Sequence, residues 1–457
     1  MLRTLTALLA LTFTTAAAEI ATGEIGPVPV EMRAALNLAD FYQKHLDVSG
    51  LPVLGSAKVS DTALREAAWI VCRVLDGRPD ILTALAQNKV RLTVMAATEY
   101  TTDVPEHSQL TPRVYWDRRA RGLGATPDAP CVSCAEENLL DFRGDPYAAE
   151  NILIHEFAHA IHETGLNTVD PTFDARLKAA YDSAIARGLW KGTYASTNHK
   201  EYWAEGVQSW FDDNAKNDAQ HNDIHTRALL KEYDPALAAL CLEVLGDKPW
   251  RYLRPSKRPA PDRAHLAGFD FAHAPRFHWR AEPIPERPLV TIYTTEGEIV
   301  LELDHRAAPR TVENFLAYVH DGLYAGGRFF RTVTADNQPD SPVKISVIQA
   351  GADPKKEAQL RPPIPLERTR DTGLRHLDGT ISMARDQPDT ARDNFFICLG
   401  DQPALDFGGV RQPDGQGFAA FGRVINGMEI VRKIHAREAD GQKLREPVPI
   451  QRAIRTN

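Results

Sequence analysis

The sequence lacks long apolar runs, basic blocks and a dense set of cysteines. After its first twenty residues, no apolar run reaches the roughly 20 residues that cross a bilayer. The 53 lysines and arginines are outnumbered by 61 aspartates and glutamates, which gives a net charge of −8, and they form no cluster. We therefore expect no transmembrane segment in the mature protein and no nucleic-acid partner, because nucleic-acid binding needs a concentrated basic surface.

Cysteine is also scarce, with 5 residues in 457. Cys398 lies in a strand-like run and is expected to be a buried free thiol. The other four, Cys72, Cys131, Cys134 and Cys241, could pair in three ways, and the sequence does not choose among them. Cys131 and Cys134 form a single CxxC in a segment that reads as a loop. Without a second pair this is a weak zinc signal, so a structural disulfide or no special role is expected.

The N-terminus has the layout of a secretory signal peptide over residues 1–18. Arg3 supplies a positive charge, residues 5–13 are apolar, and three alanines at 16–18 offer a cleavage site before Glu19. The apolar run is too short for a membrane anchor. The sequence therefore predicts export, and a periplasmic or secreted protein.

The length of 457 residues predicts two or three domains, and the 43% hydrophobic and 25% charged fractions are ordinary for globular protein. Residues 19–250 read as mainly helical, with one strand near 90–96. The helices expected from apolar spacing and capping residues are 63–75, 79–87, a helix opened by Asp145-Pro146 and running to His162, a helix after Asp170-Pro171 ending at Gly188, and one starting at Asn198.

Residues 251–286 differ in character, being rich in proline and arginine with little periodicity. Such a segment is a linker or is draped over a neighbouring surface, and its aromatic residues favour draping. From residue 287 onward short strand patterns take over. Residues 289–303 read as two strands joined at Glu296-Gly297, and a helix is expected at 308–320.

The octet HEFAHAIH at residues 155–162 carries a metal-binding pattern. His155 and His159 lie one helical turn apart, so both imidazoles can reach one cation, and Glu156 is placed to take a proton from bound water. A catalytic zinc needs a third protein ligand. His162 lies about two turns from His155, too far to share one ion. Glu201 on a later helix is the better candidate.

With Tyr194 and Glu205, these residues resemble the gluzincin metallopeptidases, most closely the catalytic domain of the anthrax lethal factor type. The match covers HEFAH and residues 194–211. It implies one zinc ion held by His155, His159 and Glu201. It also implies that Glu156 is the general base, that Tyr194 donates to the oxyanion, and that Glu205 is a second carboxylate that could orient a ligand histidine. A metal-free helix and a purely structural zinc site are the alternatives.

Five segments of the second half occur in a recognisable order. They are FFR (329–331), VIQAG (347–351), GTISMAR (379–385), NFFICLG (394–400) and GFAAFGRV (417–424). Over residues 287–457 they resemble a cyclophilin-type peptidyl-prolyl isomerase. The resemblance implies a closed eight-stranded barrel with two helices, no cofactor, and proline-containing polypeptides as substrates.

The resemblance also assigns roles to individual residues. Rotation about an X–Pro bond meets a barrier of roughly 18–20 kcal/mol, and a guanidinium near the prolyl nitrogen stabilises the twisted amide. Arg331 matches the catalytic arginine. The substrate-binding positions are Gln349 and Asn394 for the peptide backbone, Phe396, Leu405 and Phe418 for the proline ring, and Ala384 for the adjacent groove.

Several positions depart from the cyclophilin pattern. Asn394 stands where eukaryotic members usually have glutamine, and Ala404 where they have tryptophan. Ser346 and Val347 replace a phenylalanine and a methionine, which predicts a looser pocket and weak cyclosporin binding. Insertions at 335–342 and 407–416 are expected to lengthen loops.

The sequence thus predicts an α+β protein of two domains. A mainly helical zincin-like domain (19–250) and the segment 251–286 precede a cyclophilin-like barrel (287–457). The favoured function is an exported prolyl isomerase that carries a zinc metallopeptidase-like domain. One alternative is a zinc-dependent peptide hydrolase with the barrel as substrate-binding module. The other is a non-catalytic, zinc-stabilised protein that binds the cell envelope.

Overall fold

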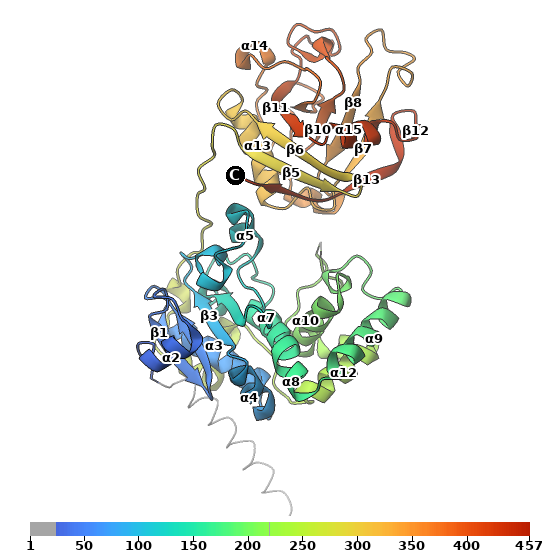
Figure 1. Cartoon of the computed structure of the whole chain (residues 1–457). Coiled ribbons are helices and arrows are strands. Elements are labelled where there is room, and N and C mark those ends of the chain that lie inside the picture. The colour runs from blue at the N-terminus through green and yellow to red at the C-terminus, as the bar shows by residue number, and fades with distance from the viewer. Residues whose placement is uncertain (1–23, 219) are drawn as a thin grey trace, which may run out of the picture. The chain divides into compact units, whose positions relative to one another are not determined.

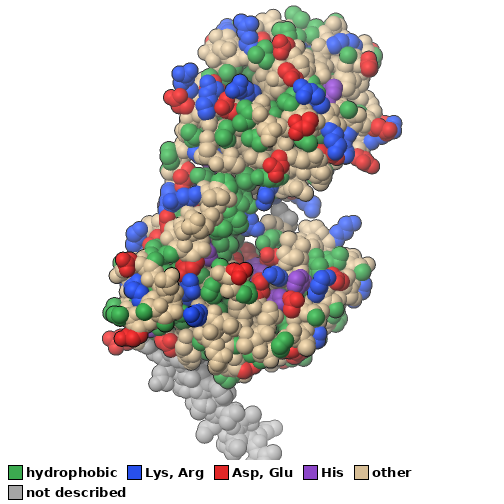
Figure 2. All heavy atoms as spheres, in the orientation of Figure 1, with side chains coloured by type: hydrophobic (Ala, Val, Ile, Leu, Met, Phe, Trp, Pro, Cys, Tyr) green, Lys and Arg blue, Asp and Glu red, His purple; other side chains and the backbone are tan. Residues whose placement is uncertain are grey.

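The computed structural model describes residues 24–218 and 220–457, and these form two compact units (Figure 1). The first unit takes in the described residues up to Leu110 together with Arg119–Arg280. The second consists of Thr111–Arg118 and Ala281–Asn457. The signal peptide predicted for residues 1–18 lies outside the described residues. Figure 2 shows acidic and basic side chains interspersed over the visible face of each unit.

In residues 24–218 the first unit has one mixed sheet of four strands. Strands β1 (Lys44–Val48) and β2 (Leu51–Gly55) are antiparallel, while β3 (Arg91–Met95) and β4 (Cys131–Ala135) continue the sheet in parallel. The sequence pattern predicted only β3. Every residue of β2 and β4 is buried, so neither strand shows the alternation of apolar and polar residues that would reveal it.

The assignment of Cys131 and Cys134 to a loop is wrong, because both lie on the buried strand β4. Residues three apart on a strand point to opposite faces of the sheet. Cys131 accordingly packs with Met95 and Val104, whereas Cys134 belongs to the main core. The pair therefore cannot form a disulfide or share a metal. All five cysteines are described, and all are free thiols.

Helices α3, α4, α6 and α7 pack on this sheet, and α9–α12 pack on one another and, through α10, on α7. The helix bounds are α2 Val30–Leu36, α3 Asp61–Val74, α4 Pro79–Gln87, α6 Glu136–Leu139, α7 Ile152–Ala160, α8 Asn167–Val169, α9 Phe173–Ala186, α10 His199–Trp210, α11 Arg227–Tyr233 and α12 Pro235–Leu245. The helix expected to open at Asp145-Pro146 begins six residues later. Asp145 instead accepts a hydrogen bond from the backbone of Tyr147 in a turn, and Asn151 caps α7.

Two helices carry the predicted metal ligands, and their mutual position is fixed by direct contacts. The Trp203 side chain on α10 donates a hydrogen bond of 2.9 Å to the carbonyl of Ala158 on α7. Asn198 caps α10 by accepting hydrogen bonds from the backbone amides of Lys200 and Glu201. This cap sets the first turn of α10, and therefore the direction in which Glu201 points.

The proline- and arginine-rich segment packs on the first unit, which extends to Arg280 and not only to residue 250. Its anchor is Glu66 on α3, a fully buried carboxylate. Arg258 donates to both oxygens of Glu66, at 2.6 and 3.0 Å, and His265 lies 2.8 Å away. The ring of Trp69 also contacts both of these partners of Glu66, with the Arg258 guanidinium 4.2 Å above it and the His265 imidazole stacked at 5.0 Å.

Within residues 281–457 the second unit is a closed barrel of eight strands, as the cyclophilin resemblance predicts. The order around the barrel is β13-β5-β6-β11-β9-β10-β8-β7, and pairing of β13 with β7 closes it. The strands are β5 Leu289–Thr294, β6 Gly297–Leu303, β7 Arg328–Val333, β8 Val347–Gly351, β9 Thr380–Met383, β10 Phe395–Cys398, β11 Ala419–Asn426 and β13 Lys443–Arg455; the two-residue β12, Ala439–Asp440, pairs only with β13.

Helices α13 (Pro309–His320) and α15 (Met428–His435) pack on this barrel, and the single turn α14 (Thr369–Thr372) lies in a connection. Helix α5 (Arg113–Arg119) belongs, apart from its last residue, to the second unit. Among residues 24–218 and 220–457, none of the helices combines the length and apolar character required to cross a lipid bilayer.

Removing the cation that neutralises Glu66 is expected to destabilise the first unit strongly. Arg258→Ala leaves a buried carboxylate without its main partner, and the free energy of unfolding should fall by about 3–5 kcal/mol. Urea unfolding followed by tryptophan fluorescence measures this, because all seven tryptophans except Trp116 lie in the first unit. The exposed Arg276→Ala in the same segment is the control and should change little. Equal stability of the two variants would contradict the prediction.

Candidate active sites

The barrel carries a row of three predicted site residues across neighbouring strands. Arg331 on β7 is paired with Gln349 on β8, and Gln349 is paired on its other side with Phe396 on β10. Directly paired residues project from the same face of a sheet. Strand register therefore places a guanidinium, an amide and an aromatic ring side by side.

This row lines a cavity of about 720 Å³. Phe396, Leu405 and Phe418 form its apolar end, and the two phenylalanine rings meet edge to face at 5.4 Å. All seven residues predicted for the isomerase site line the same cavity: Arg331, Gln349, Ala384, Asn394, Phe396, Leu405 and Phe418.

Arg331 is held in place by two glutamine side chains. Its Nη1 donates to Oε1 of Gln349 at 2.9 Å, and its Nε donates to Oε1 of Gln442 at 3.0 Å. Burial, together with the nearby charge of Arg411, lowers the pKa of Arg331 from its usual value. The guanidinium stays charged, since arginine is not deprotonated in proteins. A half-buried cation thus borders an apolar pocket, which suits a ligand with one polar atom next to a ring.

The two insertions meet at this cavity, which the sequence did not reveal. Arg411 in the second insertion donates hydrogen bonds of 2.7–2.8 Å to Gln338, Ser341 and Val343 in or beside the first. Arg385 forms a bidentate ion pair with Asp414, at 2.8 and 2.9 Å. The inserted loops are therefore tied to each other and to the barrel, and Arg411 becomes part of the cavity wall.

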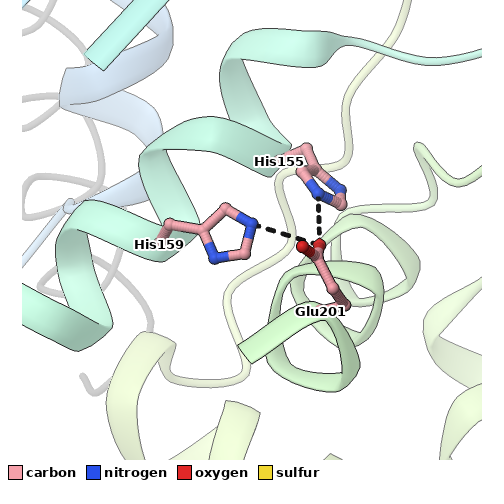
Figure 3. A group of neighbouring side chains, drawn as sticks. All are labelled: His155, His159 and Glu201. Carbon is pink, nitrogen blue, oxygen red and sulfur yellow. Dashed lines mark hydrogen bonds and ion pairs between the residues drawn. The ribbon is translucent and has the colours of Figure 1, made fainter. Parts of the chain in front are cut away.

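In the first unit, the three predicted zinc ligands converge. Figure 3 shows His155 and His159 projecting from one helix toward Glu201 on another. Oε2 of Glu201 lies 3.2 Å from Nε2 of His155 and 3.3 Å from Nε2 of His159. Ligand atoms bound to one tetrahedral zinc at about 2.0–2.2 Å are about 3.4 Å apart. The donor types and spacing therefore fit a zinc ion.

The electrostatic surroundings favour a positive charge at this point. Burial alone would raise the pKa of Glu201, but the hydrogen bonds with His155 and His159 hold it well below its usual range. Burial likewise opposes protonation of His155, yet its hydrogen bond with Glu201 and the charges of Glu156 and Glu205 raise its pKa to about 10. Two imidazoles among three carboxylates form an environment that attracts a cation.

Glu156 and Tyr194 lie at the same site. Glu156 is on α7 between the two histidines, and burial raises its pKa above the usual value. Tyr194 starts the short helix η4 (Tyr194–Ser196), with its ring centroid 6.1 Å from that of His155. Arg119 donates a hydrogen bond of 3.3 Å to the Tyr194 hydroxyl. Burial and the charge of Glu201 raise the pKa of Tyr194, so its hydroxyl keeps its proton.

His155 has two neighbours at its Nδ1. Glu205, which the gluzincin resemblance offered as a carboxylate that could orient a ligand histidine, places its Oε1 3.6 Å from Nδ1 of His155. Gln208, one turn further along α10, places Oε1 at 2.7 Å from that nitrogen, while its Nε2 donates to Glu150 at 2.9 Å. Because Nδ1 donates to Gln208, Nε2 is the nitrogen that can bind a metal, once it loses the proton that it shares with Glu201.

A glycine allows another segment to pass close to this helix. A Cβ added at Gly124 would lie only 2.6 Å from Cβ of His159. The neighbouring Leu123 pairs with Ser133 on β4, which extends the sheet edge alongside α7. Only glycine permits this approach, a requirement that a single sequence does not reveal.

His162 points away from this group, as its spacing predicted. It lies in the π-helical turn η3 (Ile161–Leu166) that follows α7, and its Nε2 contacts Asp174 at 3.0 Å. Burial lowers the pKa of His162 to about 4, so its ring is neutral.

The second unit matches a known family. Residues 289–455 match the family model described as cyclophilin type peptidyl-prolyl cis-trans isomerase/CLD. A peptidyl-prolyl cis-trans isomerase of Streptomyces antibioticus is 35% identical over 166 residues, which cover 36% of this chain and 93% of that protein.

Two further isomerases are similar to about a third of this chain. One from Dickeya dadantii is 38% identical over 146 residues, which cover 32% of this chain and 70% of the Dickeya protein. Another from Escherichia coli is 31% identical over 167 residues, covering 36% of this chain and 95% of its own. The closed barrel and these matches agree: through residues 289–455, the chain belongs to the cyclophilin-type peptidyl-prolyl cis-trans isomerase family.

Proposed function

We propose that the barrel catalyses cis–trans isomerisation of X–Pro bonds in polypeptides. The observation that carries this proposal is the row formed by Arg331, Gln349 and Phe396 beside an apolar cavity. The similar proteins named above are isomerases of this kind.

The reaction makes modest chemical demands, which these residues meet. The barrier of about 18–20 kcal/mol arises from amide resonance, and no covalent step is needed to lower it. The phenylalanines hold the proline ring, and Gln349 and Asn394 hold the flanking backbone. The Arg331 guanidinium donates to the prolyl nitrogen once twisting has localised its lone pair. Because Gln349 and Gln442 already hold the guanidinium, little reorganisation is required.

Loss of the guanidinium should remove most of the activity. We expect Arg331→Ala to lower kcat/KM by on the order of 100-fold, because a preorganised donor to the transition state is lost. The measurement is the proline-limited refolding phase of a test protein, or isomerisation of a short proline peptide. The control is Arg423→Ala, which removes an exposed arginine elsewhere on the barrel. Equal acceleration by wild type and Arg331→Ala would refute the proposal.

A second activity, zinc-dependent peptide hydrolysis by the first unit, is favoured by a separate observation. His155, His159 and Glu201 converge on one point, with Glu156 and Tyr194 beside it. When bound, zinc would polarise a carbonyl and acidify a water molecule. Glu156 would hold the proton released and pass it to the leaving amine. Tyr194, supported by Arg119, would donate to the oxygen of the scissile carbonyl.

Metal content and cleavage separate the roles of these residues. We expect one zinc at this site in the wild type, lost in His155→Ala. Glu156→Gln should retain this zinc but cleave peptides on the order of 10²–10⁴-fold more slowly, because only the base is removed. Metal analysis and a peptide-library cleavage assay provide the two readouts. The control is Glu163→Gln, on the next turn, whose carboxylate pairs with Lys200.

The outcomes distinguish the remaining alternatives. Cleavage by Glu156→Gln at the wild-type rate would exclude the peptidase mechanism. Zinc without cleavage, together with a melting temperature that falls on chelation, would favour a non-catalytic, zinc-stabilised envelope-binding protein. Cleavage enhanced at proline-containing substrates would favour the barrel as their binding module. We also propose export, on the basis of residues 1–18; mass spectrometry of the mature N-terminus, expected at Glu19, tests it.

A further inference from the structure

A second cluster of metal-ligating side chains lies in the first unit, separate from the one described above. It consists of His162, Asp174 and His199. Oδ1 of Asp174 lies 3.0 Å from Nε2 of His162 and 3.0 Å from Nε2 of His199. Two imidazoles thus converge through their Nε2 atoms on one carboxylate oxygen. This is the arrangement that His155 and His159 make around Glu201.

Three different elements supply these side chains. His162 lies in the π-helical turn η3, Asp174 in the first turn of α9, and His199 is the first residue of α10. A π-helical turn within a helical run is unusual and often marks a functional site. Here the turn directs His162 toward α9 and α10, away from the ligands on α7.

The polar contact of the His162 ring lies on the side of the cluster. Its side chain is fully buried, and among the described residues its Nδ1 has no hydrogen-bond partner. Its Nε2, by contrast, faces Asp174 at 3.0 Å. Phe173 packs edge-on against the ring, with centroids 5.7 Å apart. Nε2 is therefore the nitrogen of this buried ring that is placed to bind a metal ion.

The open side of the cluster suits an ion that keeps water ligands. The Asp174 side chain is 47% exposed and the His199 side chain 22% exposed, so solvent reaches the group from one side. Adjacent ligand atoms bound at about 2.1 Å lie about 3.0 Å apart in an octahedral arrangement and about 3.4 Å apart in a tetrahedral one. Oδ1 of Asp174 lies 3.0 Å from Nε2 of His162 and of His199, which fits the octahedral spacing. An octahedral ion with three protein ligands has three positions left for water.

The donor types also suit a transition-metal ion. One carboxylate oxygen and two imidazole nitrogens form a donor set that prefers first-row transition metals over magnesium or calcium. Glu163 and Lys200, which follow His162 and His199 in the sequence, pair with each other at 2.5 Å and so do not occupy the cluster's donor atoms.

We propose that His162, Asp174 and His199 bind a second divalent transition-metal ion. This site does not depend on zinc binding by His155, His159 and Glu201. Its ligands join η3, α9 and α10, the same helical region that carries the first group. An ion here would tie the end of the His155/His159 helix to the start of the Glu201 helix, and so hold the first site in shape.

Metal stoichiometry of the full chain tests the proposal, with zinc as the probe. The protein is stripped with chelator, dialysed against buffered zinc, and analysed for zinc per chain. We expect two zinc ions in the wild type. Asp174→Asn and His199→Gln change partly exposed positions. Each variant should retain one zinc ion per chain, or should bind zinc at the second site at least 100-fold more weakly. Asp182→Asn, an exposed aspartate on the same helix, should retain two.

Companion variants assign the remaining ion. His155→Ala should also bind one zinc, and the double variant His155→Ala/Asp174→Asn none, with circular dichroism showing that each variant is folded. A single zinc that is lost in Asp174→Asn but kept in His155→Ala would support this proposal while excluding the first site. A single zinc unaffected by both Asp174→Asn and His199→Gln would overturn it. Cobalt provides a second readout, because six-coordinate cobalt absorbs far more weakly than tetrahedral cobalt.

Discussion

The candidate zinc site of the first unit centres on one carboxylate oxygen shared by two imidazoles. Glu201 lies 46 positions after His155, and the intervening chain leaves α7, makes helix α9 and returns. Two contacts outside the metal cluster fix α10 against α7. The Trp203 side chain donates a hydrogen bond to the α7 backbone, and Asn198 caps the first turn of α10. The geometry of the candidate zinc site is therefore a property of helix packing. It is then reinforced by Gln208, which orients His155.

The barrel achieves its geometry by a different route. Its site residues come from adjacent strands, so hydrogen-bond register alone sets Arg331, Gln349 and Phe396 side by side. A closed barrel has no free edge along which register could slip. The isomerase site is thus built into the pattern of strand pairing, whereas the metal site requires distant helices to meet.

These two routes explain what could be predicted from the sequence. The barrel motifs are local and ordered, so the cyclophilin resemblance that they carry predicted the barrel and the seven site residues that line its cavity. Helical spacing paired His155 with His159, whereas the resemblance to the gluzincins supplied Glu201. Strands β2 and β4 did not, because buried strands lack alternation, and neither did Gln208, whose role depends on an angle between helices. The start of α7 was misplaced because Asp145-Pro146 opens a turn that imitates a helix start. The contact of Arg411 with the other insertion could not be predicted, since nothing in a loop sequence specifies which loop it meets.

The closing of the barrel by β13 has a consequence for how the chain is made. Residues 443–455 pair with β5, formed from residues 289–294, and with β7. The barrel therefore cannot close until synthesis has passed residue 455, whereas the segment that anchors Glu66 is already complete at Arg280. The residues of the first unit are thus all present before those that close the barrel. Until the last strand is made, β5 and β7 expose unpaired edges, and these are the surfaces at which a nascent chain is open to chaperones and to aggregation.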